Sequence, residues 1–235
     1  MNKPELLQAM LDTVDEPIDR IYVVDNGGVL RDQHIRWPWD TNRIHVADPG
    51  YNLGVARSWN EIIRANVDAN WWVIACNDIR IQEGSLGQLR SIMEQSTDPT
   101  LCRVVMGNEA GWGNHFGLFG VNAALIDTVG WFDENFISIY FEDNDYLERI
   151  DKLQRMGHTI NLPLVQSHTQ HIGNASWKYG DDHLGVDNAR TWEVNGSYIG
   201  TKREADYEPD PTAWKHPSVK RMRNTWKLPP NNNVK

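Results

Sequence analysis

The most informative part of the sequence is GWFDENFISIYFEDNDYLER, from Gly130 to Arg149. It begins with an aromatic turn and continues through an apolar, strand-like run from Phe136 to Phe141. That run ends at three closely spaced acids, Glu142, Asp143 and Asp145. Acids packed this closely repel one another, so a fold keeps them together where a cation or a proton transfer uses them. The stretch therefore predicts a functional site where a strand-like segment meets a helix.

Short apolar segments with strand character alternate with helical segments on the N-terminal side of this stretch. The order is typical of an α/β domain in which helices flank a mixed, mostly parallel sheet. The expected strands cover 20–24, 43–46, 71–75, 103–106 and 116–121, and the expected helices cover 4–14, 55–66, 84–95, 122–129 and 143–156.

The composition limits the classes of function. The chain has 235 residues, 40% of them hydrophobic, which is enough for one domain with a sizeable core. A net charge of −9 argues against wholesale binding of nucleic acid. The chain has only two cysteines, no signal-peptide pattern and no apolar run of membrane-spanning length. We therefore expect a cytoplasmic protein, with no more than peripheral membrane contact.

The C-terminal segment differs in charge from the rest of the chain. We expect one domain over 1–208 and a basic tail over 209–235. From Pro211 onward the tail has six Lys or Arg residues, two Trp residues and no acid. Such a segment could dock on an anionic membrane surface or a partner protein, fold back over the acidic body, or remain solvated.

Two acids follow predicted strands at the point where each strand ends. Asp25 opens the sequence DNGG after the first strand, and Asp78 closes the sequence CND after the third. In open α/β sheets, ligands bind in the crevice beyond the carboxyl ends of the strands. Each motif alone is equally compatible with an ordinary turn. Together they predict one ligand crevice, in which Asp25 accepts hydrogen bonds from a base or ribose.

A loop rich in small and polar residues leads into the second expected helix. It reads NLGVARSWN from Asn52 to Asn60. The N-terminus of a helix favours anions, and Arg57 adds a full positive charge. Helix capping with a solvated arginine is the structural alternative, and by itself the loop does not distinguish the two.

Four motifs in order resemble the inverting glycosyltransferases of family 2. The family pattern N-x-G-x-A-x-x-x-N matches over 52–60, and the retained aspartate of its Asp-x-Asp motif matches Asp78, with Cys76 in the first position. The G-x-F-D-E and E-D-x-D … R block matches within 130–149, and H-x-G-x-x-S matches over 171–176. The resemblance covers about 18–178, and its closest likeness is to the rhamnosyltransferase-like branch.

The resemblance implies a GT-A fold, which is a Rossmann-like nucleotide-diphospho-sugar transferase fold, and a metal-assisted hexosyltransferase reaction with inversion. It implies that Asp143 removes the proton of the acceptor hydroxyl, with Glu142 as the reserve assignment. Asp145 is expected to cap the helix or to pair with Arg149. A solvated, dipole-stabilised helix start remains the structural alternative for the whole cluster.

The resemblance also implies a donor site and a metal site. The donor would be a UDP-, dTDP- or GDP-linked sugar, and Mn²⁺ or Mg²⁺ would bind Asp78, with His171 as a second ligand. A zinc-protease site is excluded because the His-x-x-His spacing of 168–171 does not fit it. The residues expected to contact the nucleotide sugar are Asp25, Asn52, Gly54, Arg57, Asn77 and Asp78.

The acceptor is expected to be a glycan, a lipid-linked molecule or a protein. The glycine- and aromatic-rich segment 107–120 lies before the acidic block, where the family often contacts sugars. Packing in a core or loop is an equal alternative for its aromatic residues. The residues expected in the acceptor or sugar pocket are Trp112, His115, Phe119 and Trp131.

Two other functions are compatible with the same motifs. A nucleotidyltransferase also uses strand-end acids and a cation, but its usual Gly-rich Arg/Lys loop is missing near the N-terminus. A non-catalytic module that binds carbohydrate or a partner could retain the fold, and Cys76 in the first metal position is consistent with it. Metal-dependent hydrolysis of a nucleotide sugar would argue against the module.

Overall fold

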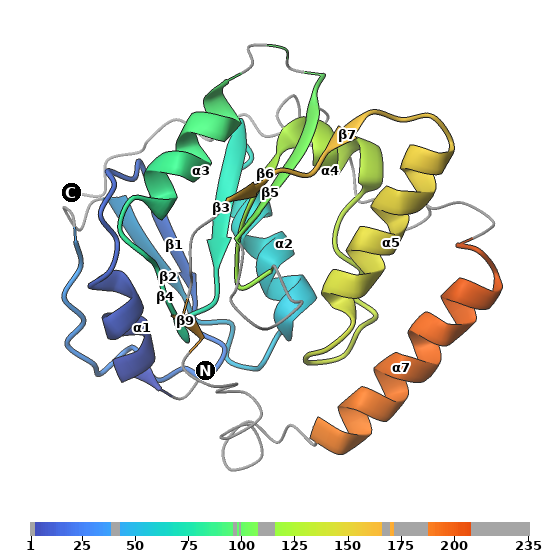
Figure 1. Cartoon of the computed structure of the whole chain (residues 1–235). Coiled ribbons are helices and arrows are strands. Elements are labelled where there is room, and N and C mark those ends of the chain that lie inside the picture. Colours follow the sequence, from blue (N-terminus) through green and yellow to red (C-terminus); the bar gives the residue numbers. More distant parts are fainter. Residues whose placement is uncertain are drawn as a thin grey trace, which may run out of the picture.

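The computed structural model describes residues 3–38, 43–95, 98, 100–107, 116–165, 170–171 and 188–207. These residues form an α/β fold in which helices flank a mixed sheet on both faces (Figure 1). The strands are β1 (Ile21–Val24), β2 (Ile44–Ala47), β3 (Trp71–Ala75), β4 (Ile79–Arg80), β5 (Cys102–Gly107), β6 (Leu118–Asn122), β7 (Ile160–Asn161), β8 (Leu164–Val165) and β9 (Gln170–His171). The helices are α1 (Pro4–Leu11), α2 (Val55–Ala65), α3 (Ser85–Glu94), α4 (Ala123–Val129), α5 (Glu142–Arg155) and α7 (Asn188–Glu204).

The strand pairings are evenly divided between parallel and antiparallel in the described part of the chain. β1 pairs with β2 in parallel, and β5 pairs in parallel with β7 and β8. β6 is antiparallel to both β3 and β5, and β4 is antiparallel to β9. The connection from β5 to β6 spans only 108–117, which is shorter than a parallel crossover usually requires. The α/β class is therefore confirmed, whereas a mostly parallel sheet is not.

Alternating side chains of the central strands build a separate core on each face of the sheet. Val104 and Met106 of β5 pack in a cluster with residues of α2, α4 and α5, whereas Val105 between them packs with α3. This follows from the two-residue period of a strand. On the face of α3, α1 packs in a further cluster with residues around β4. The result is three layers, with α1 and α3 on one side and α2, α4 and α5 on the other.

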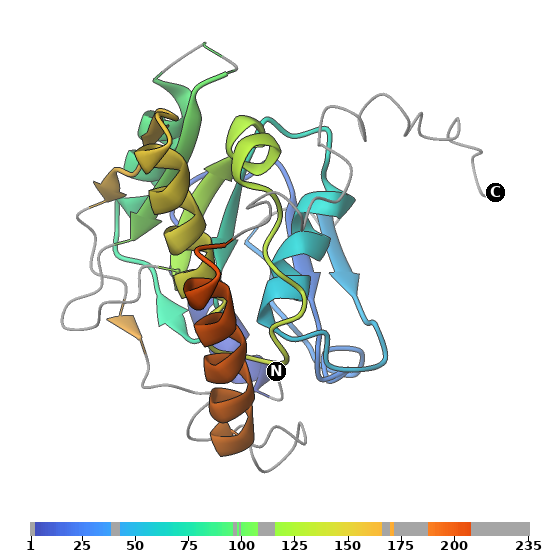
Figure 2. The ribbon, with the colours of Figure 1, turned by 90° about the vertical axis from the view of Figure 1, so that its right-hand side faces the viewer.

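The C-terminal helix α7 was not predicted from sequence. It lies along α5 (Figures 1 and 2). Arg203 forms an ion pair with Glu148 of α5, and Lys202 bonds Asp145 of the same helix. α7 exposes Trp192 and Val194 to solvent yet buries polar side chains, so it lacks the regular apolar stripe of a typical surface helix. The contacts that hold it are largely polar, and apolar periodicity is therefore a poor guide to it.

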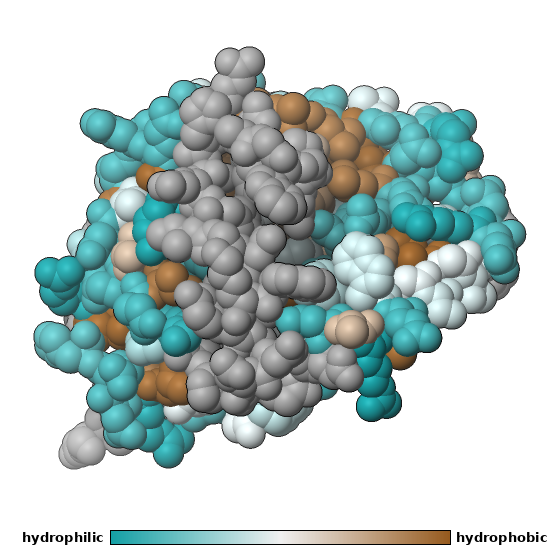
Figure 3. Space-filling view, turned by 60° about the horizontal axis from the view of Figure 1, so that its bottom comes forward, coloured by the Kyte–Doolittle hydropathy of each residue, from teal (hydrophilic) through white to brown (hydrophobic). Residues whose placement is uncertain are grey.

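The described surface is mixed in character. The face shown in Figure 3 combines hydrophilic residues with small hydrophobic patches. Within the described residues, no helix combines the length and the hydropathy that crossing a membrane requires. The basic tail predicted over 209–235 lies outside the described residues.

Candidate functional site

A cavity of 1480 Å³ runs along β1 and β3, and its lining includes the residues that follow both strands. Its volume exceeds the roughly 300–1,000 Å³ of a typical small-molecule site. Its walls include residues of β1, β3, α2 and the segment that leads into α5. Strand-end and helix-start polar residues from three separate parts of the sequence meet there, namely Asp25, Asn26, Asn77, Asp78, Glu142, Asp143 and Asn144.

Asp25 is buried at the end of β1, with 3% of its surface exposed. The Leu30 N–H donates to Oδ2 at 2.8 Å, so the DNGG turn that the sequence suggested is present. The other oxygen, Oδ1, is buried without a hydrogen-bond partner in the part of the chain that the structure describes. A buried carboxylate oxygen without a partner is costly, and a ligand donor in the cavity would relieve that cost.

Asp78 lies at the end of β3, where the chain turns into β4. It is 5% exposed and lines the cavity with Asn77. β4 pairs with β9 in a register that sets Ile79 opposite His171. The backbone of His171 therefore runs beside the residue that follows Asp78, although the His171 side chain lies outside what the structure describes. Sequence alone could not show this proximity, because the two residues are far apart in the chain.

Glu142 and Asp143 open α5 on the cavity wall. Glu142 is 6% exposed, and its Oε2 has no hydrogen-bond partner among the described residues. Burial, with the neighbouring charges of Asp143 and Asp145, raises the pKa of Glu142 to about 8. Asp143 is partly buried, and desolvation raises the pKa of its carboxyl above the usual value. Two neighbouring carboxyls that share one wall thus resist carrying two charges at once.

The segment before α5 is irregular, although its apolar run is strand-like in sequence. Ser138, Tyr140 and Phe141 have positive φ angles of 57°, 83° and 73°. Left-handed backbone cannot continue a strand, so the chain turns sharply instead of extending. The run therefore delivers Glu142 and Asp143 from a tight loop and not from the end of a strand.

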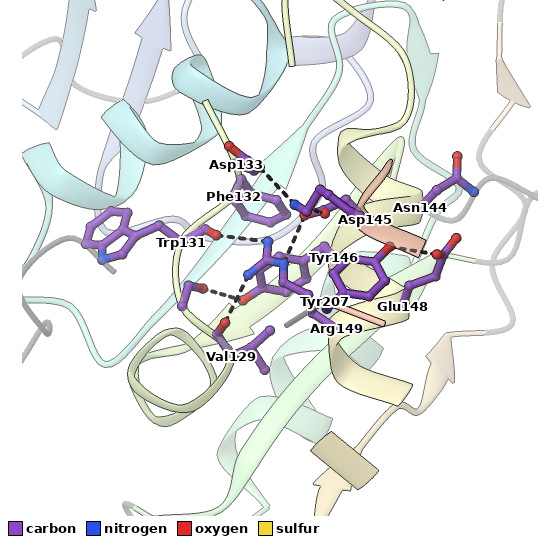
Figure 4. A network of polar contacts seen from close by, with 12 residues as sticks. Val129, Trp131, Phe132, Asp133, Asn144, Asp145, Tyr146, Glu148, Arg149 and Tyr207 are labelled. Carbon is purple, nitrogen blue, oxygen red and sulfur yellow. Dashed lines mark hydrogen bonds and ion pairs between the residues drawn. The ribbon is translucent and has the colours of Figure 1, made fainter. Parts of the chain in front are cut away.

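Asp145 faces the protein interior and is separate from the cavity acids. It is fully buried and pairs with Arg149 at 2.9 Å, as the four-residue spacing predicted (Figure 4). Arg149 also donates to the carbonyls of Val129 and Trp131, at 2.9 and 3.0 Å. The Tyr146 hydroxyl donates to the Gly130 carbonyl at 3.1 Å. The arginine of the E-D-x-D … R block thus fastens α5 to the turn that precedes it.

The loop before α2 makes contacts within the protein. Asn52 Oδ1 accepts the Gly54 N–H at 2.9 Å, and Gly54 has a φ of 77°. A Cβ at Gly54 would lie 3.0 Å from backbone atoms of Ser138, so this close approach requires glycine. Asn60 exchanges hydrogen bonds with the backbone of Phe132, at 2.9 and 3.1 Å. These contacts join the loop to the GWFDE turn.

The other residues predicted for ligand contacts divide into three groups. Arg57 is half-exposed and lies 3.8 Å from Glu134, with which it forms an ion pair. Phe119 and Trp131 are buried in the hydrophobic core and do not line the cavity. Trp112 and His115 lie outside the described residues. The structure thus gathers Asp25, Asn77, Asp78, Glu142 and Asp143 at the cavity, but not Asn52, Gly54, Arg57, Phe119 or Trp131.

Sequence reasoning missed the contribution of α7. Trp192 lines the cavity, is 55% exposed and packs against Tyr140 and Phe141 with ring centroids 5.3 and 4.7 Å away. Asn195, three residues on, is buried against the loop before α5. The weak apolar pattern of this region gave no signal for either residue.

The described residues could hold a divalent cation only in an open site. They include no group of three or more His, Cys, Asp or Glu side chains arranged to hold a metal ion. Mg²⁺ commonly binds through one or two carboxylates with water and substrate phosphates. The buried carboxylate of Asp78 on the cavity wall fits that pattern, whereas a cage made of protein ligands alone does not.

Comparison with known proteins gives no family assignment. No family model matches the chain, and no curated protein matches it significantly.

Proposed function

We propose that this protein is an inverting glycosyltransferase that uses a nucleotide-diphosphate sugar as donor. The observation that carries the proposal is that Asp25, Asp78 and Asp143 all line one cavity. They come from two strand ends and a helix start, in the order in which family 2 enzymes have their donor, metal and base residues. Buried oxygens of Asp25 and Glu142 that lack partners in the described part mark the cavity as a place for a polar ligand.

The charges around the cavity favour a cation-assisted donor. The carboxyls would repel a diphosphate, and the two arginines on the wall are already paired. Arg20 bonds Asp68 at 2.9 Å, and Arg90 bonds Glu16 at 2.9 Å. A divalent cation on Asp78, with His171 as a candidate second ligand, would neutralise the diphosphate leaving group as its charge develops.

The mechanism is a single displacement in which an acceptor hydroxyl attacks the anomeric carbon. Asp25 Oδ1 accepts a hydrogen bond from the ribose or base of the donor. Asp143 accepts the proton of the attacking hydroxyl as the bond from the sugar to the diphosphate breaks. Because desolvation raises the pKa of Asp143, its carboxylate is a stronger base than an exposed aspartate. Glu142, protonated at neutral pH, avoids a second negative charge beside it.

The fold type, the compartment and the acceptor's point of entry are also part of the proposal. A GT-A arrangement accommodates the parallel β1–β2 pair and the cavity at the strand ends. The chain has only two cysteines, Cys76 and Cys102, too few for a disulfide framework, which favours a reducing compartment such as the cytoplasm. The acceptor would enter beside Asp143, where the exposed ring of Trp192 forms part of the wall.

Donor binding provides the test of this proposal. Thermal-shift measurements would use UDP-, dTDP- and GDP-sugars, with and without Mn²⁺, on the wild type, Asp78→Ala and Glu83→Ala. Glu83 is an exposed acid near Asp78 that does not line the cavity, so its variant is the matched control. We expect one nucleotide class to stabilise the wild type and Glu83→Ala in a metal-dependent manner, and the shift to vanish in Asp78→Ala.

Two outcomes of the thermal-shift test would contradict the proposal. If no nucleotide sugar shifts the melting temperature of the folded wild type, the transferase proposal fails and the binding-module alternative is favoured. A shift that survives in Asp78→Ala and does not depend on metal would remove the cation from the mechanism.

A further inference from the structure

The loop that delivers the proposed catalytic base has a strained backbone. Three of the four residues from Ser138 to Phe141 have positive φ angles, and none of them is glycine. Side chains with a Cβ rarely adopt this conformation, because it costs free energy at each residue. Such a loop persists only where its surroundings fix it. Glu142 and Asp143 follow directly, so whatever fixes the loop also sets the position of the two cavity carboxyls.

One side chain from α7 bonds four backbone groups of the loop. Asn195 is 1% exposed. Its Nδ2 donates to the carbonyls of Ile137 and Ile139 at 2.9 Å, and to that of Tyr140 at 3.1 Å. Its Oδ1 accepts the Ile137 N–H at 3.1 Å. A single amide thus contacts four backbone groups of the loop, with its two N–H hydrogens shared among three carbonyls, and an apolar side chain at this position would remove those bonds.

The loop also has hydrogen bonds to the segment that leads into α2 and to the start of α7. The Val55 N–H donates to the Ser138 carbonyl at 2.7 Å. The Tyr140 hydroxyl donates to Asn188 Oδ1, at the start of α7, at 3.1 Å. The loop is therefore held between α2 and α7, and the side chain of Asn195 bonds four of its backbone groups.

We propose that Asn195 is a positioning residue that fixes the 137–141 loop and thereby places Asp143 for proton transfer. The placing of Asp143 for proton transfer rests on the proposed function. The claim that Asn195 fixes the loop does not depend on that function. Asn195 does not line the cavity, so it acts through the backbone and not through contact with substrate. This role for Asn195 gives α7 a function, although none of the sequence motifs includes that helix.

The test uses the full chain with Asn195→Ala, and Asn122→Ala as the matched control. Asn122 also bonds three backbone groups, accepting from Leu125 and Arg103 and donating to Leu101, but it lies away from the cavity. Hydrogen exchange of the loop amides is measured first, because it needs no substrate. We expect exchange at Ile137 to rise at least about tenfold in Asn195→Ala, and to be unchanged in Asn122→Ala.

Kinetics with the donor identified by thermal shift form the second arm. A misplacement of about 1 Å can lower the rate about 10²-fold, so we expect that loss in kcat for Asn195→Ala, with the KM for donor unchanged. Asn122→Ala should retain the wild-type kcat at a temperature where both variants are folded. Equal loss of kcat in the two variants would show a merely structural role and overturn the inference.

The two arms separate the two proposals. Unchanged exchange at Ile137 in Asn195→Ala would overturn the hold on the loop, whatever the enzyme does. Increased exchange at Ile137 in Asn195→Ala, together with a wild type that turns over no nucleotide sugar, would confirm the hold and defeat the proposed function.

Discussion

Asp143→Asn is expected to lower the rate of sugar transfer by about 10²–10⁴-fold, the usual loss when a general base is removed. Asparagine has nearly the same shape but cannot accept the proton of the acceptor hydroxyl. Donor binding should be unchanged, because the proposed diphosphate contacts are at Asp78. The measurement is release of nucleoside diphosphate at saturating donor and acceptor, at pH 7.

Two comparison variants make this result specific. Asp151→Asn changes an exposed acid of the same helix, which pairs with Arg155 at 3.0 Å, and should leave the rate unchanged. Glu142→Gln should have a much smaller effect than Asp143→Asn, because a carboxyl with a pKa of about 8 is already mostly neutral at pH 7. A loss confined to Glu142→Gln would transfer the role of base to Glu142.

Lys202→Met is expected to destabilise the fold by about 3–5 kcal/mol, because it leaves the buried carboxylate of Asp133 without its counter-charge and leaves Asp145 with Arg149 alone. Lys202 is 5% exposed and bonds Asp133 at 2.8 Å as well as Asp145. Urea denaturation at pH 7 measures the free energy of unfolding. Arg203→Met is the control on the same helix, since its half-exposed pair with Glu148 should contribute no more than about 1 kcal/mol.

The effect of Lys202→Met should also depend on pH. Burial opposes ionisation of Asp133, but the bonds from Lys202, Asn135 and Tyr198 outweigh it and lower the pKa of Asp133 below its usual value. The stability that this group contributes is present above its unfolded pKa of about 3.9 and is lost as pH falls through the folded pKa. The difference between wild type and variant should therefore shrink in acid. A difference that stays constant from pH 7 down to pH 3 would contradict the assignment.

The acids at strand ends were predictable because each follows a compact apolar strand with a turn signal. Asp25 and Asp78 required only the rule that ligands gather beyond the carboxyl ends of strands. The Asp145–Arg149 pair was predictable because a helix brings residues four apart together. Local patterns of this kind depend on a few neighbouring residues, so a single sequence contains them.

The rest of the site depends on contacts between distant segments. Phe136 to Phe141 has the composition of a strand, but Asn195 and the backbone around Val55 bend it into a loop. Trp131 is of a residue type that often contacts sugars, yet its ring is buried in the core. A local pattern does not show which residues of a turn will contact another helix. Polar helices such as α7 also lack the regular spacing of apolar residues from which a helix is predicted.

The most direct test of the central claim is the stereochemistry of the transferred sugar. Proton NMR would follow the wild type with an α-linked form of the donor found by thermal shift, with Mn²⁺ and with acceptor or water. A single displacement predicts that the first product has the β configuration and that its formation stops in Asp143→Asn. A product that retains the α configuration, or a bound donor that is never consumed, would contradict the account.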